Sequence, residues 1–226
     1  MTAVKKVFKT TGDCIVDAFK KLPYAFYVLV HPFDGFYDLK NDPKRKSVNT
    51  AVLLMILLAF SAVFKRQLLG YMYTSVAEQL SLNVILEIGI AILPYILWTV
   101  ANWCFSSLMD GDGKFGDIFV ATAVGTLPLT LCNFIAVPLS HYLPLESSSV
   151  FTTVNSMGVV IAYMEIFLGM ITTHQYSVKK GIATTVLSIV GILIIAFIIV
   201  LIVFLVQQVT GFASSLWTEI SFRINE

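Results

Sequence analysis

The stretch GILIIAFIIVLIVFLV, Gly191–Val206, decides the class of fold. It contains no charged side chain, and mostly apolar residues extend it backwards to about residue 182. A helix needs about 20 mostly apolar residues to cross the hydrocarbon core of a bilayer. The stretch therefore predicts a membrane-spanning helix.

Four further apolar stretches precede it. The first is SVNTAVLLMILLAFSAVF, Ser47–Phe64, which is followed by Lys65 and Arg66. The five predicted spans cover residues 48–64, 82–108, 116–141, 150–173 and 182–207. Pro128 and Pro138 should kink the third span, because proline removes a backbone donor from a helix. We expect an all-α integral membrane protein, a five-transmembrane-helix bundle.

The composition agrees with this class. Of the 226 residues, 57% are hydrophobic and only 13% are charged, and the mean hydropathy is +0.83. Cys14, Cys104 and Cys132 are odd in number and have no CxxC spacing, so no disulfide framework is implied. Residues 1–22 contain no uninterrupted apolar run, and we therefore expect no cleavable signal peptide.

Lys and Arg are distributed unevenly. Nine of the fifteen precede the first span. Because Lys and Arg are retained in cytoplasmic loops, we counted them on both sides of the membrane, and a cytoplasmic N-terminus gives twelve inside against three outside. This predicts a multi-pass protein of the cell membrane with its N-terminus cytoplasmic and its C-terminus extracytoplasmic. The other basic residues are scattered, and we expect no nucleic-acid partner.

The predicted organisation has three parts: a cytoplasmic N-terminal tail (1–47), a transmembrane domain (48–207) and a short extracytoplasmic C-terminal tail (208–226). Apolar residues recur in the N-terminal tail at steps of three and four, which is the helical period. They are Ile15, Phe19, Leu22, Phe26, Leu29, Phe33 and Phe36. Pro23 and Pro32 should break this pattern into short helices. These helices would lie in the lipid headgroup region, cap the transmembrane bundle, or do both.

Two groups of tail residues are candidate contacts for a partner or for the membrane surface. They are the aromatic residues Phe19, Phe26 and Phe33 and the basic residues Lys44, Arg45 and Lys46. A basic residue near an anionic leaflet contributes about 1 kcal/mol to membrane binding. The alternative is that the basic triplet only fixes the topology.

Glu87 and Glu165 lie inside predicted spans, where an ionised carboxylate at mid-depth costs about 3 kcal/mol. Each belongs to a helical stripe of small or polar residues that should face the bundle interior. The candidate polar and helix-packing residues on these stripes are Glu87, Asn102, Gly158, Ala162, Glu165 and Gly169. The two carboxyl groups could serve an ion or proton pathway in a channel or carrier, or they could join helices by hydrogen bonds. No Lys or Arg within the predicted spans offers a partner, which favours helix joining.

Residues Met109–Asp117 carry the Asp and Gly content of a calcium loop. Lys114 and Phe115 occupy positions that such a loop gives to a ligand and to glycine, so the pattern fails. A tight turn is expected instead, with Asp117 near a helix N-terminus. The sequence shows no metal-ligand spacing and no GxSxG motif, paired intramembrane aspartates or phosphate loop. We expect no catalytic, metal or cofactor site.

Two stretches resemble bacterial members of the Yip1 domain family. They are HPFDGFYDLK, His31–Lys40, and ANWCFSSLMDGDGKFGDIFVATAVGTLPL, Ala101–Leu129. In that family a Pro-Phe element precedes the first span, and a Gly-rich hairpin with a following proline links the second and third spans. The resemblance covers roughly residues 25–207.

The resemblance implies five transmembrane helices and a cytoplasmic N-terminus. Eukaryotic relatives act in Golgi and vesicle trafficking and contact small GTPases. Their DLYGP-type element is missing here, where the nearest text is DGFYDL, Asp34–Leu39. Bacterial relatives are often found beside transporter genes, ABC systems among them. The sequence therefore predicts a non-enzymatic accessory or scaffold subunit whose partners are the lipid bilayer and other membrane proteins, such as ABC transporter subunits.

Overall fold

The computed structural model describes residues 2–70, 73 and 83–224, and the regular structure within them is entirely helical. Two helices, α1 (Thr2–Val30) and α2 (Pro32–Asn41), come first. They are followed by α3 (Val48–Leu68), α5 (Val84–Leu108), α6 (Phe115–Gly125), α7 (Leu127–Tyr142), the short turn η2 (Leu145–Ser147), α8 (Ser148–His174) and α9 (Val178–Ile224).

Five segments of this described chain are long and apolar enough to cross a membrane: α3, α5, α6 together with α7, α8, and α9. They correspond one to one to the five predicted spans, which confirms a helical protein with five potential spans. The predicted end of the first span, residue 64, is four residues too early. The helix continues through Lys65 and Arg66 to Leu68, so both basic side chains belong to the span.

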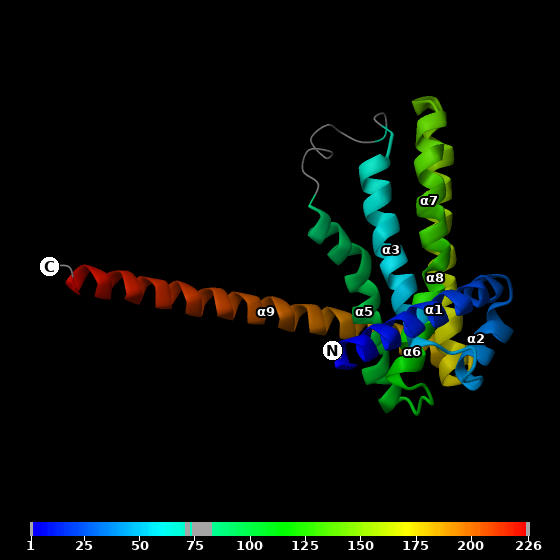
Figure 1. The fold of residues 1–226 in the computed structure, drawn as a ribbon, viewed down its shortest axis with the longest axis horizontal. Helices are drawn as coiled ribbons and strands as arrows, with labels where there is room; N and C mark the ends of the chain where they lie inside the picture. The colour runs from blue at the N-terminus through cyan, green and yellow to red at the C-terminus, as the bar shows by residue number, and fades with distance from the viewer. Residues whose placement is uncertain (1, 71–72, 74–82, 225–226) are drawn as a thin grey trace.

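Helix α6 is enclosed by α3, α5 and α8, and it also contacts α1 and α2. Helix α7 runs alongside both α3 and α8, and α1 crosses α3 near one end of the bundle with α2 beside it (Figure 1). The core joins α6 to α1, α2 and α3, and its members include Val28, Phe36, Leu54, Leu58, Val120, Ala123 and Val124. Those core side chains that lie in potential spans stabilise the bundle chiefly by close van der Waals packing, because lipid tails are as apolar as the side chains themselves.

The third span is broken at Thr126, between α6 and α7, as expected from Pro128, whereas α7 continues through Pro138. Pro128 lies in the first turn of α7, where a missing N–H costs little. The Thr126 hydroxyl donates to the Ala123 carbonyl at 2.8 Å, and the Thr130 hydroxyl donates to the Thr126 carbonyl at 3.2 Å. Threonine side chains therefore satisfy backbone acceptors at the break.

The prediction that Pro23 would break the first helix is wrong. Pro32 does begin a new helix, but α1 continues through Pro23. Ala18 and Ala25, on either side of the proline, are both buried against the bundle. This packing holds the helix together across the missing hydrogen bond, which is how tertiary contacts override local propensity.

The last helix leaves the bundle. Near its start α9 packs on α5, where Gly191 lies so close to the Phe105 ring that a larger side chain would collide with it. Every side chain from residue 197 to residue 220 is exposed. The helix points away from the bundle, in a direction transverse to α3 and α7 (Figure 1). It continues well beyond the predicted end of the span at residue 207.

Candidate functional site

The N-terminal helices present one apolar face to the bundle and another to the surroundings. Ala18, Ala25 and Val28 face inward. The three candidate aromatic residues face outward, since Phe19, Phe26 and Phe33 are 56%, 43% and 64% exposed. An exposed apolar face of this kind has to be covered by lipid or by another protein.

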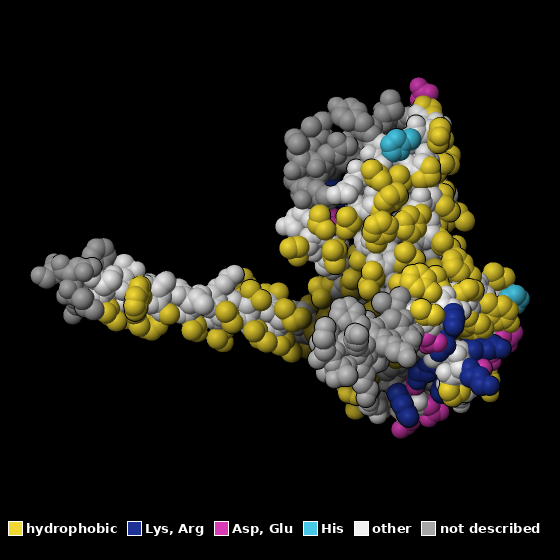
Figure 2. Space-filling model, in the orientation of Figure 1, with side chains coloured by type: hydrophobic (Ala, Val, Ile, Leu, Met, Phe, Trp, Pro, Cys, Tyr) yellow, Lys and Arg dark blue, Asp and Glu magenta, His cyan; other side chains and the backbone are white. Residues whose placement is uncertain are grey.

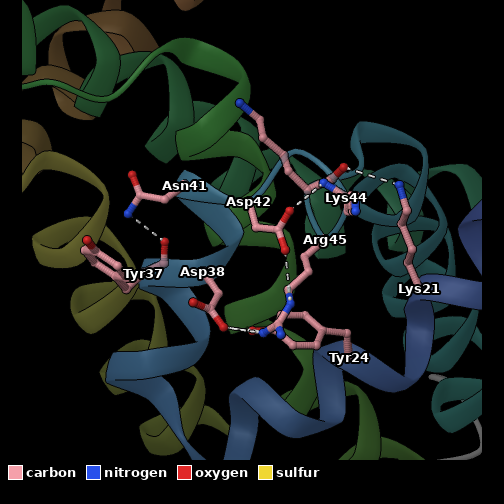
Figure 3. A network of polar contacts seen from close by, with 9 residues as sticks. Lys21, Tyr24, Tyr37, Asp38, Asn41, Asp42, Lys44 and Arg45 are labelled. Atoms are coloured by element: carbon pink, nitrogen blue, oxygen red, sulfur yellow. Dashed lines mark hydrogen bonds and ion pairs between the residues drawn. The ribbon is translucent and has the colours of Figure 1, made fainter.

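The loop between α2 and α3 is anchored by Arg45. Its guanidinium is paired with Asp38 on α2, and Arg45 Nε lies 3.4 Å from Asp42 Oδ2. Arg45 Nη1 also donates to the Tyr24 hydroxyl at 2.9 Å, and that hydroxyl donates to Asp38 at 3.1 Å (Figure 3). Partial burial raises the pKa of Tyr24, partly opposed by the Arg45 hydrogen bond. The network ties α1, α2 and the loop together.

The neighbouring basic residues have different surroundings. Lys46 forms an ion pair with Asp117, a buried carboxylate whose second oxygen accepts from the Lys114 backbone N–H at 3.0 Å. Asp117 thus caps the start of α6, as the sequence predicted. Lys44 is exposed, and within the described chain its side chain has no hydrogen bond or ion pair. Charged side chains gather at this end of the molecule (Figure 2). Two members of the basic triplet therefore hold the fold together, and a surface role for all three stays a prediction.

A buried polar cluster lies where the loop 109–114 meets α8. His174 Nδ1 accepts from the Gly113 backbone N–H at 3.2 Å, and His174 Nε2 lies 2.9 Å from Asn102 Oδ1. The Asn102 amide donates onward to Ser188 at 3.4 Å. Because Nδ1 accepts, Nε2 must carry the proton and donate to Asn102. This chain of bonds connects α5, α8, α9 and the loop.

Tyr176 extends this cluster towards the surface. Its ring stacks on His174 with centroids 5.0 Å apart, and the Lys180 ammonium lies 4.8 Å from the Tyr176 ring centroid. Burial is the chief cause that raises the pKa of Tyr176. A Cβ at Gly113 would lie 2.7 Å from His174 Cε1. The Gly-rich loop is thus explained by close packing over the histidine.

The predicted small-residue stripe of α8 lies inside the bundle. Gly158, Ala162 and Gly169 are all buried. A Cβ at Gly158 would lie 2.5 Å from Cys132 Cβ on α7, and one at Gly169 would lie 3.0 Å from the Phe36 ring. Glu165 is also buried, at 6% exposure, with no hydrogen-bond partner among the described residues. The stripe therefore brings helices close together, but the structure shows no hydrogen bond from Glu165 that joins them.

The other intramembrane carboxylate lies on the wall of a cavity. Glu87 lines a cavity of about 440 Å³ between α3, α5, α7 and α8, together with Lys65, Arg66 and Asn133. Two cations thus share a cavity with Glu87, although no ion pair within 4.0 Å joins them to it among the described residues. The cations lie there because α3 extends further than predicted and includes both Lys65 and Arg66.

A second cavity of about 420 Å³ lies between α5, α8 and α9. Its walls are apolar and aromatic and include Trp98, Ile166, Phe167 and Ile192. It shares Pro94, Tyr95 and Tyr163 with the first cavity, so the two adjoin. Glu165 lines neither of them, and the structure therefore does not bring Glu87 and Glu165 to one cavity.

The sequence did not predict Lys65, Asn133 and Asn155 as site residues, nor His174 as the partner of the predicted residue Asn102. Lys65, Asn133 and Asn155 meet across three helices, and Asn102 meets His174 from 72 positions away. No local spacing signals such contacts. Among the described residues, no three His, Cys, Asp or Glu side chains lie together in a way that could hold a metal ion.

Comparison with known protein families gives a match to the Yip1 domain over residues 26–201. The chain belongs to the Yip1 family. The matched Yip1 domain begins within α1, includes both stretches on which the resemblance rested, and ends within α9. Comparisons with curated proteins and with solved structures gave no significant match. This Yip1 protein is a multi-pass membrane protein, and its apolar helices contact the lipid bilayer.

Proposed function

We propose that this Yip1-family protein is a non-enzymatic accessory or scaffold subunit of a membrane complex. Its partner is another membrane protein, and an ABC-type transporter is the specific class we would test first. The protein acts in the cell membrane with its N-terminus in the cytoplasm. The tail of residues 1–47 and the end of the chain after residue 207 extend from a transmembrane domain.

The observation that carries this proposal is the uncovered surface of α9. A helix of 47 residues is about 70 Å long, whereas about 20 residues suffice to cross the hydrocarbon core. The helix therefore continues beyond a membrane-length segment. In its last part the apolar residues Val209, Phe212, Leu216 and Ile220 recur at steps of three and four, and all are exposed.

This stripe gives one face of the extension an apolar character. Gln207, Ser214 and Thr218 lie on the opposite face, because successive helical residues are about 100° apart. A partner that itself spans the membrane could cover the apolar face both within the bilayer and beyond it. The arrangement resembles an amphipathic helix that lays its apolar face into a groove.

The test is co-purification from the native membrane in a mild detergent. A Phe212→Gln/Leu216→Gln double variant removes the apolar stripe, and Ser214→Gln/Thr218→Gln is the matched control on the opposite face. Both pairs are exposed, so neither change should affect folding. We expect only the first variant to lose its co-purifying membrane protein, identified by mass spectrometry. Retention of the same partner by both variants would contradict docking through α9.

A further inference from the structure

The two adjoining cavities together form a groove that changes from polar to apolar along α5. The polar part contains Lys65, Arg66 and Glu87, and the apolar part contains Trp98, Phe167 and Ile192. Tyr163, which lines both parts, is 62% exposed, so the groove opens on the surface of the protein. Each part has the volume of about 300 to 1,000 Å³ that is typical of small-ligand sites.

The cation in the polar part is held in place without being neutralised. Lys65 Nζ donates to Asn133 Oδ1 at 3.2 Å and also to Asn155 Oδ1. Asn133 is fixed in turn, because its amide donates to the Ser61 hydroxyl at 3.2 Å. An ammonium has three N–H donors, so one remains after both asparagine bonds. Both partners are uncharged amides, and they orient the ammonium while leaving its charge in place.

The balance of charge in the groove is positive. Lys65 and Arg66 both line it, against one carboxylate, Glu87. Among the described residues, none of these three side chains is in an ion pair within 4.0 Å. Lys65 is partly buried, and a partly buried charge without a counter-ion favours the binding of an anion.

The position of the charges selects the kind of anion. Lys65 lies about one turn before the end of α3 at Leu68, and the end of a helix of membrane-spanning length is where the headgroup region is expected. The apolar part lies further along α5 towards the other end of the bundle. A free anion would fill only the polar part. We propose that the groove binds one anionic amphiphilic lipid, with its headgroup at Lys65 and Arg66 and an acyl chain between α5, α8 and α9.

The test compares two lipids with identical acyl chains. The purified protein in a neutral detergent is exchanged with equimolar phosphatidylglycerol and phosphatidylcholine, and bound lipid is measured by native mass spectrometry. We expect phosphatidylglycerol to be retained preferentially. Each basic residue removed should lower that preference about fivefold, the effect of about 1 kcal/mol.

Four substitutions separate the groove from the general surface: Lys65→Met and Arg66→Gln at the headgroup site, Ile192→Trp in the apolar part and Lys44→Met as a distant control. Arg66→Gln removes a charge from a side chain that forms no hydrogen bond or ion pair with a described residue, so it tests the headgroup site even if Lys65→Met fails to fold. Ile192→Trp fills the apolar part and should reduce retention of both lipids. Lys44→Met removes an exposed charge at the opposite end of the molecule and should change nothing.

Three results would overturn the proposal. The first is equal retention of the two lipids by the unmodified protein. The second is a loss in Lys44→Met as large as that in Arg66→Gln, which would indicate only general surface attraction. The third is displacement of phosphatidylglycerol by excess inorganic phosphate, which would assign the polar part to a free anion.

Discussion

Gly158 lies at the closest approach of α8 to α7, and its missing side chain is what allows that approach. A Cβ there would lie 2.5 Å from Cys132 Cβ and 2.9 Å from its sulfur. We expect Gly158→Ala to force the helices apart at a cost of about 1–3 kcal/mol, seen as a lower thermal midpoint in a neutral detergent. Gly89→Ala is the control, because a Cβ at that helical position has no neighbour within 4 Å. Equal midpoints for the two variants would contradict close packing at Gly158.

The Lys46–Asp117 ion pair joins the start of the first span to the start of the third. Lys46→Met would leave the buried Asp117 carboxylate without its cation, although the Lys114 N–H would still donate to it. We expect a loss of about 2 kcal/mol of stability, measured by denaturant titration in detergent. The matched control is Lys44→Met, which removes a neighbouring charge that is exposed. A loss of the same size in both variants would show that net charge, rather than this pair, is responsible.

The sequence predicted the roles of residues whose contacts are with near neighbours in the chain. Asp117 follows a tight turn and begins an apolar stretch, so its position as a helix cap was predictable. The partners of Asn102 and Lys65 were not predictable, because they come from other helices and depend on how the bundle packs. Glu165 was predicted to be buried, and it is, but the hydrogen bond expected for it is not seen among the described residues.

At the scale of elements, the exposed aromatic face of α1 and α2 is a second candidate contact surface. Changing Phe19, Phe26 and Phe33 together to Ser, with Lys44, Arg45 and Lys46 kept, removes apolar surface that the bundle does not cover. We expect the variant to insert normally and to keep its thermal midpoint but to lose a co-purifying partner. Normal insertion with an unchanged partner profile would exclude docking through this face.

The existence of the long helices was predictable because the length of an apolar run is enough to indicate a membrane span. All five spans were found because a bilayer demands about 20 apolar residues whatever the tertiary contacts. Helix ends were harder to predict, since burial carries α1 through Pro23. The uniformly apolar run ends at about residue 207, but the amphipathic sequence after it continues the same helix to Ile224. Proline positions and the length of an apolar run carry no information about tertiary packing, and it is the packing that determines where these helices end.

For the whole molecule, the distribution of Lys and Arg predicts the topology. We expect a reporter fused after Lys180 to be active only in the cytoplasm and one fused to the C-terminus to be active only outside it. In the structure α9 is transverse to α3 and α7 (Figure 1). All five helices can therefore traverse one bilayer only if α9 rotates until it is roughly parallel to the others. A cytoplasmic signal from the C-terminal reporter would refute the five-span topology.

The long last helix has a mechanical consequence. It is fixed at its base, where Gly191 seats against Phe105, and residues 197–224 extend about 40 Å beyond the packed part. A rotation of about 10° at the base would move the far end by roughly 7 Å, because the helix is continuous and stiff. The molecule thus contains a lever arm whose base packs on α5, through the Gly191–Phe105 contact and the Asn102–Ser188 hydrogen bond among others. A small shift of the α5 surface that leaves the bundle intact would therefore produce a larger displacement at the far end of α9 and of any partner bound there.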